Sequence, residues 1–535
     1  MTATAATTSA RAARASRPGN GFGAILRIQL RTGWKALAIW VVALIGGYLA
    51  TVASIDSLYD SPEALQGYDD TVASDPAMAA INGTPYGADT LGGVVSNEFG
   101  FIAAIAIPLM GLLLVVRQTR AQEEIGMLEL LRSRGVGARA PWTAAVLLAL
   151  VALALVGGGM ATVLVAYGEP ADAALLYGAS IAGLGAVFAG IATLVGQLLR
   201  RSGSVTGVGI LVLGVAYVTR AAGDVRDNGW KWLSPLAWQQ ETRPFADDAR
   251  VWPLLLALGV AAVLIAAGLT LVGGRDLGSA MVASRPGPAR AGGLTRSTWG
   301  LALRAHASAG AAWISGSIAV GVIFGAFTDD IAEAIAANPA LSAVMGDGQA
   351  TEAYVGITLM MLVLMAIGCL GQSLGRVRGE ETGGRLEPTL ARSVSRPGWL
   401  ATHAVWMVVF PLLALLAGAA GLALTADGEV DDIVVSAVAY VPAVLVALGI
   451  AVALFGLLPR LTGLIWLVLG YIAFVAILGG TLDLPDWAMN LSPVSAIGTL
   501  PVDEVDATVE WLLVGIAVVL LAAGFVGLRR RDIPR

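Results

Sequence analysis

The chain contains few of the side chains with which proteins bind metals or perform nucleophilic chemistry. Its 535 residues include one cysteine, Cys369, and two histidines, His306 and His403. A single thiol can form neither a disulfide framework nor a thiolate metal site. Both histidines lie near the ends of apolar segments, where an interfacial position is common for an amphipathic side chain. The sequence therefore predicts no metal site and no cofactor bound by this chain.

Lysine is nearly absent as well, and this bears on ATP binding. A phosphate-binding loop of the G-x-x-x-x-G-K-[ST] type needs a lysine that reaches the phosphates. The two lysines, Lys35 and Lys231, follow no such glycine pattern. The sequence predicts that this chain has no ATPase site of its own, and it indicates no catalytic residue.

Charged residues of all kinds are scarce, at 13% of the chain, whereas hydrophobic residues make up 57%. Soluble domains carry about 25% charged residues. A helix needs about 20 apolar residues to cross the hydrocarbon layer of a membrane. Twelve apolar segments approach this length and predict an all-α polytopic membrane protein with twelve transmembrane helices. These spans are 36–55, 99–116, 142–167, 173–199, 204–219, 252–273, 311–327, 353–374, 403–425, 433–458, 462–481 and 511–528.

The centres of these predicted spans hold no charged side chain. Ion-coupled pumps keep carboxylates or histidines in their spans, where these groups form the ion pathway. The lack of such residues argues against a proton- or sodium-coupled mechanism.

Charges of opposite sign fall on opposite sides of the predicted bundle. With both termini in the cytosol, most of the 33 Lys and Arg residues are cytosolic and most of the 38 Asp and Glu residues are external. Loops 56–98, 328–352 and 482–510 contain acidic residues and no basic residue. The positive-inside rule therefore predicts a multi-pass protein of the inner membrane with both termini cytosolic.

Two stretches of the first half of the chain recur in the second half at one constant offset, which indicates a tandem repeat. Each half holds six predicted spans. Because six is an even number, the chain is expected to form two parallel pseudo-symmetric six-helix halves. The recurring residues are Arg120, Glu123, Gly126, Leu128, Glu129, Arg134 and Val136, matched by Arg378, Glu381, Gly384, Leu386, Glu387, Arg392 and Val394, and Leu233-Ser234-Pro235, matched by Leu491-Ser492-Pro493.

The same repeat divides the chain into four sections. Residues 1–20 are rich in Ala, Thr, Ser and Arg and predict a disordered cytosolic leader. Residues 21–275 and 299–530 form the two six-span halves, and residues 276–298 form a cytosolic linker between them.

The first recurring stretch lies in the predicted cytosolic loops after spans 2 and 8. Ile125, Leu128 and Leu131 have helical spacing, and Pro388 suits the first turn of a helix that starts near Glu387. A short amphipathic helix can dock into a groove of a soluble partner, with charged residues setting its register. A solvated connector is the alternative. The predicted docking residues are Glu123, Glu124, Gly126, Leu128, Glu129, Arg134, Glu381, Gly384, Leu386, Glu387 and Arg392.

Residues 22–35 predict an amphipathic helix that lies at the membrane interface before span 1. Basic residues recur on one face at four-residue spacing, and apolar residues occupy another. A weaker version of the pattern, from Trp299 to His306, precedes span 7. A generic positively charged flank is the alternative. The apolar face consists of Phe22, Ile25, Leu26, Leu30 and Trp34.

The second recurring stretch lies in two long external segments, 220–250 and 482–510, the first of which is rich in tryptophan. Such segments can form a gate over the exit of a transport path. They can equally form an aromatic belt at the membrane interface with a turn that begins at proline. The residues of the possible gate are Trp232, Pro235, Trp238 and Pro493.

These motifs carry a resemblance to a known family. The pattern Glu-x-x-Gly-x-Leu-Glu at 123–129 resembles the coupling-helix loop of permease subunits of type-2 ABC exporters, and residues 22–35 resemble their elbow helix. The segment 232–238, followed by Arg243-Pro244-Phe245, resembles the twelve-span permeases of actinobacterial polyketide-antibiotic and drug exporters. Residues Gly383 and Pro388 depart from the first loop, so the two coupling helices need not be equivalent.

The resemblance implies a partner and a cargo. The partner is a separate cytosolic nucleotide-binding ATPase subunit, expected as a homodimer, that binds ATP and Mg. The cargo is a hydrophobic antibiotic, drug or lipid that leaves through the membrane, and nucleic acid is not expected as a partner. The sequence does not indicate which residues bind the substrate.

Two other functions are weighed against this one. A secondary drug transporter of the major-facilitator kind usually has G-x-x-x-D-x-x-G-[RK] between spans 2 and 3, and that pattern is missing here. A membrane-embedded lipid-modifying enzyme needs clustered carboxylates, histidines or a metal, whereas the acidic residues of loop 56–98 are scattered.

Overall fold

The structure is a computed structural model, and it describes residues 21–59, 61–72, 79, 82–226, 228–282, 290, 292–326, 328, 349–392, 394–426, 433–478 and 484–532. These residues form helices and connections, and no strand occurs among them. Twelve helical segments of this described part are long and apolar enough to cross a membrane. The prediction of an all-α polytopic membrane protein with twelve spans is therefore confirmed.

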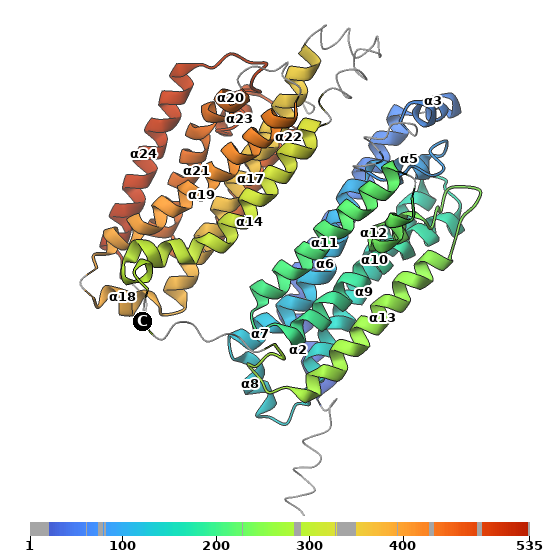
Figure 1. Ribbon diagram of the computed structural model, residues 1–535, viewed down its shortest axis with the longest axis horizontal. Helices are drawn as coiled ribbons and strands as arrows, with labels where there is room; N and C mark the ends of the chain where they lie inside the picture. Colours follow the sequence, from blue (N-terminus) through green and yellow to red (C-terminus); the bar gives the residue numbers. More distant parts are fainter. Residues whose placement is uncertain are drawn as a thin grey trace, which may run out of the picture. The chain divides into compact units, whose positions relative to one another are not determined.

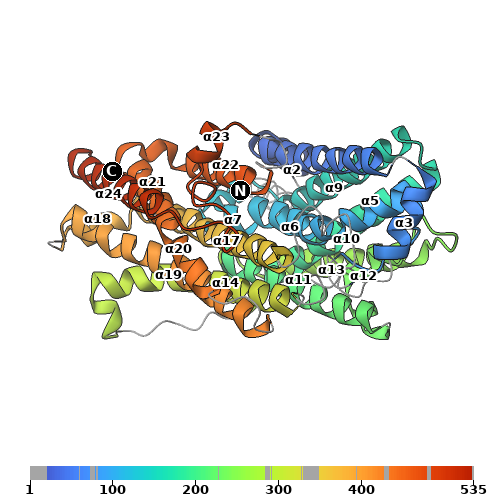
Figure 2. The same cartoon turned by 90° about the horizontal axis from the view of Figure 1, so that it is seen from above.

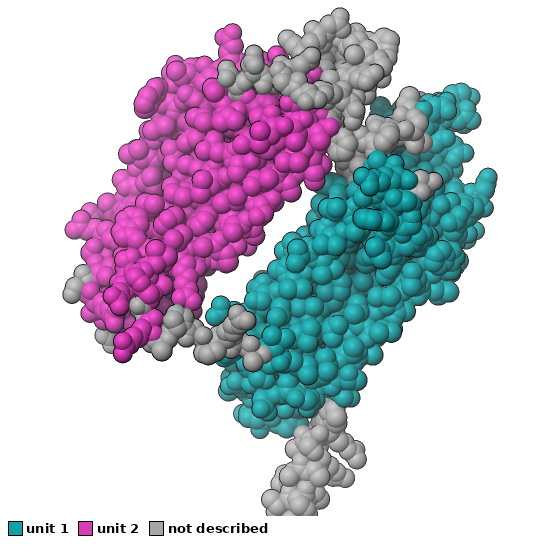
Figure 3. Space-filling model, viewed as in Figure 1, with its two compact units in different colours: residues 1–286 teal, residues 287–535 magenta. Residues whose placement is uncertain are grey.

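The chain divides into two compact units, Met1–Pro286 and Gly287–Arg535 (Figure 3). Six of the twelve spans lie in each unit. The boundary falls inside the segment 276–298 that the sequence predicts as a linker. The predicted leader 1–20 lies outside the described residues, as do residues 283–289 of the linker.

Unit 1 is built around α10, which packs against α6, α9 and α13 and is buried along most of its length. Its long helices run side by side (Figures 1 and 2). The spans are α2 (Phe22–Leu58), α6 (Gly100–Gln118), α9 (Ala140–Ala166), α10 (Ala171–Leu198), α11 (Ser202–Val225) and α13 (Trp252–Leu271). The shorter helices are α3 (Pro62–Val72), α5 (Leu91–Glu98), α7 (Arg120–Glu124), α8 (Met127–Arg132), η1 (Gly229–Leu233), α12 (Pro235–Gln240) and η2 (Val272–Gly274).

Unit 2 has two main helix pairs, because α19 packs along α14 and α21 packs along α24. Its spans are α14 (Thr298–Ala326), α17 (Gln349–Thr382), α19 (Arg396–Thr425), α20 with α21 (Ile433–Ala439 and Val441–Leu457), η4 with α22 (Pro459–Leu464 and Ile465–Leu478) and α24 (Ala507–Arg530). The shorter helices are η3 (Leu294–Arg296), α18 (Leu386–Leu390) and α23 (Asp486–Leu491).

Glycine allows helix backbones to touch in both units. A Cβ atom on Gly178 would lie 2.2 Å from the carbonyl oxygen of Gly157, and one on Gly456 would lie 2.0 Å from that of Gly524. Apolar side chains gain little by leaving lipid for a protein interior, so close van der Waals packing of small residues holds spans together. These glycines are therefore part of what stabilises each bundle.

The separate elbow helix expected at residues 22–35 does not occur. The helix α2 runs without a break from Phe22 to Leu58. Its buried face is Ile25, Gln29 and Gly33, whereas Leu30 and Trp34 of the predicted apolar face are 47% and 54% exposed. The first helix of unit 2, α14, is likewise continuous from Thr298 to Ala326.

A buried amide explains why the start of α2 stays attached to unit 1. The Gln29 side chain donates to the carbonyl oxygens of Gln118 at 3.2 Å and Pro141 at 3.0 Å. The Gln118 side chain donates in return to the carbonyl oxygen of Gln29 at 3.2 Å. Buried polar groups need such partners. These bonds join one face of residues 22–35 to α6 and α9.

Replacing Gly178 with alanine is expected to lower the thermal unfolding midpoint of the protein in detergent. The added methyl group would collide with the Gly157 backbone, and overpacking of this kind costs about 1–3 kcal/mol. The matched control is Gly158→Ala, because a Cβ there meets nothing within 4 Å. Removing a glycine from a helix interior normally stabilises it by about 0.5–1 kcal/mol. The two variants should therefore shift the midpoint in opposite directions, and equal shifts would contradict the close packing.

Candidate functional site

The predicted docking loop of unit 1 is two short helices, α7 and α8, instead of one amphipathic helix. The chain breaks at Gly126, whose φ of 76° is a left-handed conformation that side chains rarely adopt. Ile125 lies at this break and is 69% exposed. The expectation that Ile125, Leu128 and Leu131 share one helix face is therefore wrong.

The loop of unit 2 has a related course. Its glycine, Gly384, has a φ of 69°, and the short helix α18 begins at Leu386, one residue before the predicted start. Pro388 lies in the first turn of α18, as predicted, where its missing N–H costs no helical hydrogen bond. Both loops therefore turn at a glycine just before a short helix, α8 in unit 1 and α18 in unit 2.

Glu123 of unit 1 is buried in an ion-pair cluster, called here the Glu123 cluster. Its carboxylate lies 3.1 Å from Arg120 and 2.6 Å from Arg275, and it accepts the N–H of Gly278 at 2.8 Å. Arg275 is the residue that follows η2 at the end of the sixth span. The cluster therefore joins the loop after the second span to the end of the sixth.

Glu381 of unit 2 forms an equivalent Glu381 cluster. Its carboxylate lies 2.6 Å from Arg378 and 2.5 Å from Arg531. Arg531 follows α24, the last span of unit 2. Arg378 and Glu381 were singled out by the repeat, but Arg275 and Arg531 were missed. The available signal was that each of them directly follows the last span of its half.

The predicted docking residues thus fall into two sets. Glu123, Leu128, Glu381 and Leu386 are buried inside their own units, and Gly126 and Gly384 form the turns. Glu124 is exposed, and its carboxylate accepts the backbone N–H and the hydroxyl of Ser202, both at 2.6 Å. The recurring residues that remain exposed for a partner are Glu129, Arg134, Glu387 and Arg392.

The Leu-Ser-Pro segment of unit 1 lies at the opposite end of the unit from α7 and α8 (Figure 1). The Ser234 hydroxyl accepts the N–H of Leu236 and donates to the carbonyl oxygen of Ala216. The indole of Trp238 donates to the carbonyl oxygen of Trp232 at 2.8 Å. The proline-initiated turn expected for this segment is therefore a short helix, α12, that starts at Pro235.

The matching segment of unit 2 shares the burial pattern but not the helix. Ser492 and Pro493 are buried, and the N–H of Ser495 donates to the Ser492 hydroxyl at 3.3 Å. The chain continues there in turns. Serine before proline caps the following turn in both units, which explains locally why this pair recurs.

A charged cluster holds the segment of unit 1. Glu241 has a side chain only 2% exposed, and it lies 2.7 Å from Lys231, 2.8 Å from Arg243 and 3.4 Å from Arg250. The hydroxyl of Tyr86 also donates to it at 2.8 Å. Burial alone would raise the pKa of the Glu241 carboxyl, but Lys231, Tyr86 and Arg243 together lower that pKa below its usual value.

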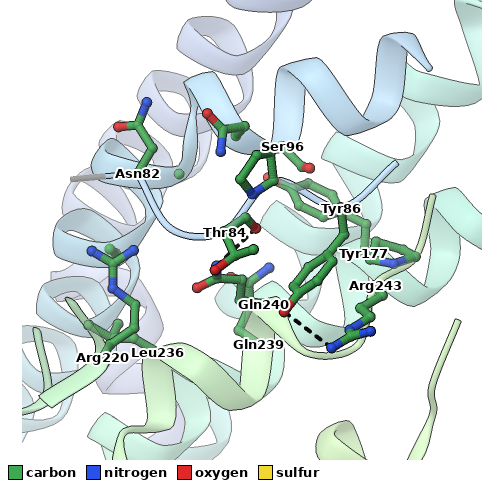
Figure 4. Close-up of a pocket in the computed structure, with 15 residues that line it drawn as sticks. Asn82, Thr84, Tyr86, Ser96, Tyr177, Arg220, Leu236, Gln239, Gln240 and Arg243 are labelled. Carbon is green, nitrogen blue, oxygen red and sulfur yellow. Dashed lines mark hydrogen bonds between the residues drawn. The ribbon is translucent and has the colours of Figure 1, made fainter. Parts of the chain in front are cut away.

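A small polar cavity of about 40 Å³ lies beside this cluster (Figure 4). Tyr86, Arg220, Gln240 and Arg243 are among its lining residues. Small-molecule sites usually measure about 300–1,000 Å³, so this cavity has room for water but not for a drug. Sequence reasoning missed the cluster, although its basic residues stand out among the otherwise acidic loops that the sequence predicts to be external.

Unit 1 also has an open apolar groove of about 410 Å³ along α9, α10 and α13. Its lining includes Gly157, Gly178, Ala182 and Leu254, and the polar groups that would orient a ligand are missing from it. The residues that bind substrate therefore stay unassigned.

The two histidines contact each other in unit 2. Nε2 of His306 lies 3.1 Å from Nδ1 of His403, between α14 and α19, and both side chains are buried. The expectation of two separate interfacial histidines is therefore wrong. Among the residues that the structure describes, no group of three or more His, Cys, Asp or Glu side chains is placed to hold a metal ion.

Substituting Glu241 with glutamine should loosen the segment 228–250. Removing one partner of a buried ion pair leaves cations uncompensated and costs about 3–5 kcal/mol. Trypsin should therefore cleave after Lys231 and Arg250 faster in Glu241→Gln than in the parent protein, as measured by mass spectrometry. The control is Asp247→Asn, because Asp247 is exposed. Equal cleavage rates in all three proteins would mean that the charges do not hold the segment.

Comparisons with known proteins agree with this architecture. A family model described as the C-terminal domain of multidrug efflux system permease Rv1217c matches residues 295–529. The chain is also 33% identical over 540 residues to the multidrug efflux system permease protein Rv1217c of Mycobacterium tuberculosis, with 97% of each chain covered. The similarity thus extends over both units, and it confirms the expected kinship with exporter permeases. The chain belongs to the family of multidrug efflux permeases.

Proposed function

We propose that the chain is the membrane subunit of an ATP-driven exporter of hydrophobic compounds, and that a separate cytosolic ATPase subunit drives it. The observation that carries this proposal is the common design of the two loops. In each, a buried glutamate and a buried leucine anchor the loop, and a glutamate and an arginine stay exposed. Family membership supports export, and the lack of a phosphate-binding loop in the sequence is consistent with an ATPase in a separate chain.

In the proposed orientation, the protein spans the inner membrane of the cell. Both termini and both docking loops then lie in the cytosol. Within unit 1, α7 and α8 lie at one end, and α3, α5 and α12 lie at the other (Figure 1). Basic residues gather at the first end, and the loop 56–98 at the second end is acidic. The positive-inside rule supports this orientation.

The first docking surface is defined here as Ile125, Met127, Glu129, Leu130 and Arg134. Its apolar members are 69%, 44% and 67% exposed. Exposed apolar groups beside charges suit a protein groove, because burial there removes apolar area from water.

The second docking surface is more polar. It consists of Arg385, Glu387, Pro388 and Arg392, all exposed. A homodimeric ATPase would offer the same groove to both surfaces. The first is expected to contribute more hydrophobic affinity, and the second more charge-assisted hydrogen bonds.

In the proposed cycle, ATP binding closes the ATPase and displaces the two loops. The two six-span halves then move and expel an apolar compound from a central cavity or from a leaflet of the membrane. No covalent chemistry takes place in this chain. Trp232, Pro235, Trp238 and Pro493 belong to the segments proposed to close the exit. Trp232 stacks on Trp252 at 4.7 Å, so the segment of unit 1 would move with the sixth span.

Reversing both exposed glutamates, Glu129→Arg with Glu387→Arg, should weaken binding of the ATPase by at least about tenfold. Charge-assisted hydrogen bonds contribute about 1.5–3 kcal/mol each. The dissociation constant of the ATPase can be measured on detergent-purified subunits. The matched control reverses Glu63 and Glu504, one exposed glutamate in each unit. Unchanged affinity in the Glu129 and Glu387 variant would refute the docking role of these residues.

Dye export from proteoliposomes tests the energy source. Vesicles that contain this chain and its ATPase should move rhodamine 6G only when ATP is supplied on the side of the ATPase. Vesicles with this chain alone should move none, because the chain has no phosphate-binding loop. Dye movement by the chain alone under a proton or sodium gradient would instead favour an ion-coupled secondary transporter.

A further inference from the structure

The two ion-pair clusters connect parts of the chain that lie far apart in sequence. Arg275 reaches Glu123 across 152 residues, and Arg531 reaches Glu381 across 150 residues. Both glutamate side chains are only 2% exposed. The arginine that leaves the last span is thus bonded to α7 in unit 1 and to the last turn of α17 in unit 2, and each of these leads directly into a docking surface.

We infer that Arg275 and Arg531 are positioning residues of the transport cycle, each of which transmits displacement of its docking loop to the sixth span of the same unit. The inference rests on the proposed function of the loops. Its physical basis is that a buried ion pair holds its two segments in one relative position. A loop that moves must therefore carry the span end with it, or break the pair.

The geometry suits such a rigid connection. The guanidinium of Arg275 contacts both carboxylate oxygens of Glu123, at 2.6 and 2.9 Å. Arg531 contacts both oxygens of Glu381 in the same way, at 2.5 and 3.0 Å. Two parallel hydrogen bonds from a planar group fix direction as well as distance. Lysine has one point charge and cannot reproduce this arrangement.

Each cluster also holds the segment that comes next. In unit 1, the carbonyl oxygen of Ser279 accepts from Arg120 and Arg275, both at 3.1 Å. The N–H groups of Met281 and Val282 donate to the end of α10, at 3.1 and 3.2 Å. The Glu123 cluster therefore positions the residues that lead toward unit 2.

In unit 2, the guanidinium of Arg396 donates to the carbonyl oxygen of Arg531 at 2.6 Å. This bond attaches the start of α19 to the Glu381 cluster. Each cluster thus contains an arginine–glutamate pair. The two clusters differ in the neighbouring segment that is attached to this pair.

Spin labels can test the connection without an ATPase. Replacing Cys369, the one cysteine, with alanine ensures that spin labels attach only to cysteines that are introduced. Labels at Leu130→Cys and Gly274→Cys, both exposed positions, report the distance between the loop and the sixth span by double electron–electron resonance. The distribution should be narrow in the parent and broad in Arg275→Gln, with Arg275→Lys between them. The control is Arg201→Gln, at an exposed arginine of the same unit.

Proteoliposomes with the ATPase test the role in transport. Arg275→Gln and Arg531→Gln should hydrolyse ATP but export severalfold fewer rhodamine 6G molecules per ATP, whereas Arg530→Gln should match the parent. If Arg275→Gln does not fold, the double variant Glu123→Gln with Arg275→Gln removes both charges and is compared in its place.

Three outcomes test separately the arginine connection, its part in the transport cycle and the proposed function. A distance distribution that stays narrow in the Arg275 variant would overturn the connection. An unchanged number of dye molecules per ATP would overturn its part in the cycle. A parent protein that exports no dye with ATP would refute the proposed function, and the label distances would then still decide whether the arginine holds the loop.

Discussion

A charge removed from water must be paired, because the penalty for leaving it alone is several kcal/mol. This constraint shapes both ends of unit 1 and the loop end of unit 2. Glu123, Glu241 and Glu381 are nearly inaccessible, and each lies within salt-bridge distance of at least two cationic groups. One partner of each carboxylate comes from a distant segment, namely Arg275 for Glu123, Arg531 for Glu381 and the Tyr86 hydroxyl for Glu241, so satisfying the carboxylate also joins two parts of the unit. The positions of the external segment and of the docking loops follow from this pairing.

Between these charged ends, the stability of each helix bundle depends on the close packing of its spans. Lipid tails are as apolar as leucine, so burying leucine between spans gains little free energy. Glycine pairs such as Gly157 with Gly178, or Gly321 with Gly418, bring backbones into contact instead. Between α14 and α19 polar bonds add to such a contact, since His306 lies 3.1 Å from His403 and the indole of Trp406 donates to the carbonyl oxygen of Trp299 at 3.1 Å. The close approach of these backbones therefore depends on the missing side chain at each glycine.

The sequence predicted the number of spans well, since long apolar runs are a strong and local signal. It failed where the structure depends on distant or single-residue effects. The break at Gly126 was missed because periodicity counts side chains and ignores a left-handed backbone. The attachment of residues 22–35 to unit 1 was missed because charge at 27–35 resembles an interfacial helix, whereas the decisive bond joins Gln29 to Gln118, far away in sequence. Arg275 lies 152 residues from Glu123, and no local pattern pairs them.

The repeat kept the buried residues, the turns and four exposed charges, whereas the exposed apolar residues diverged. Glutamate, glycine and leucine recur where they are buried or form a turn, whereas exposed Ile125, Met127 and Leu130 are replaced by other residue types. The external segments diverge further, since unit 2 has no counterpart of the Glu241 charges there. Its segment is held by Tyr440, whose hydroxyl donates to the carbonyl oxygen of Gly498 at 2.7 Å and accepts the N–H of Leu500 at 3.1 Å. The carboxylate of Asp503 also accepts the N–H of Thr499 there at 2.6 Å, so a hydroxyl and a carboxylate that bind backbone groups take the place of the ion pairs around Glu241.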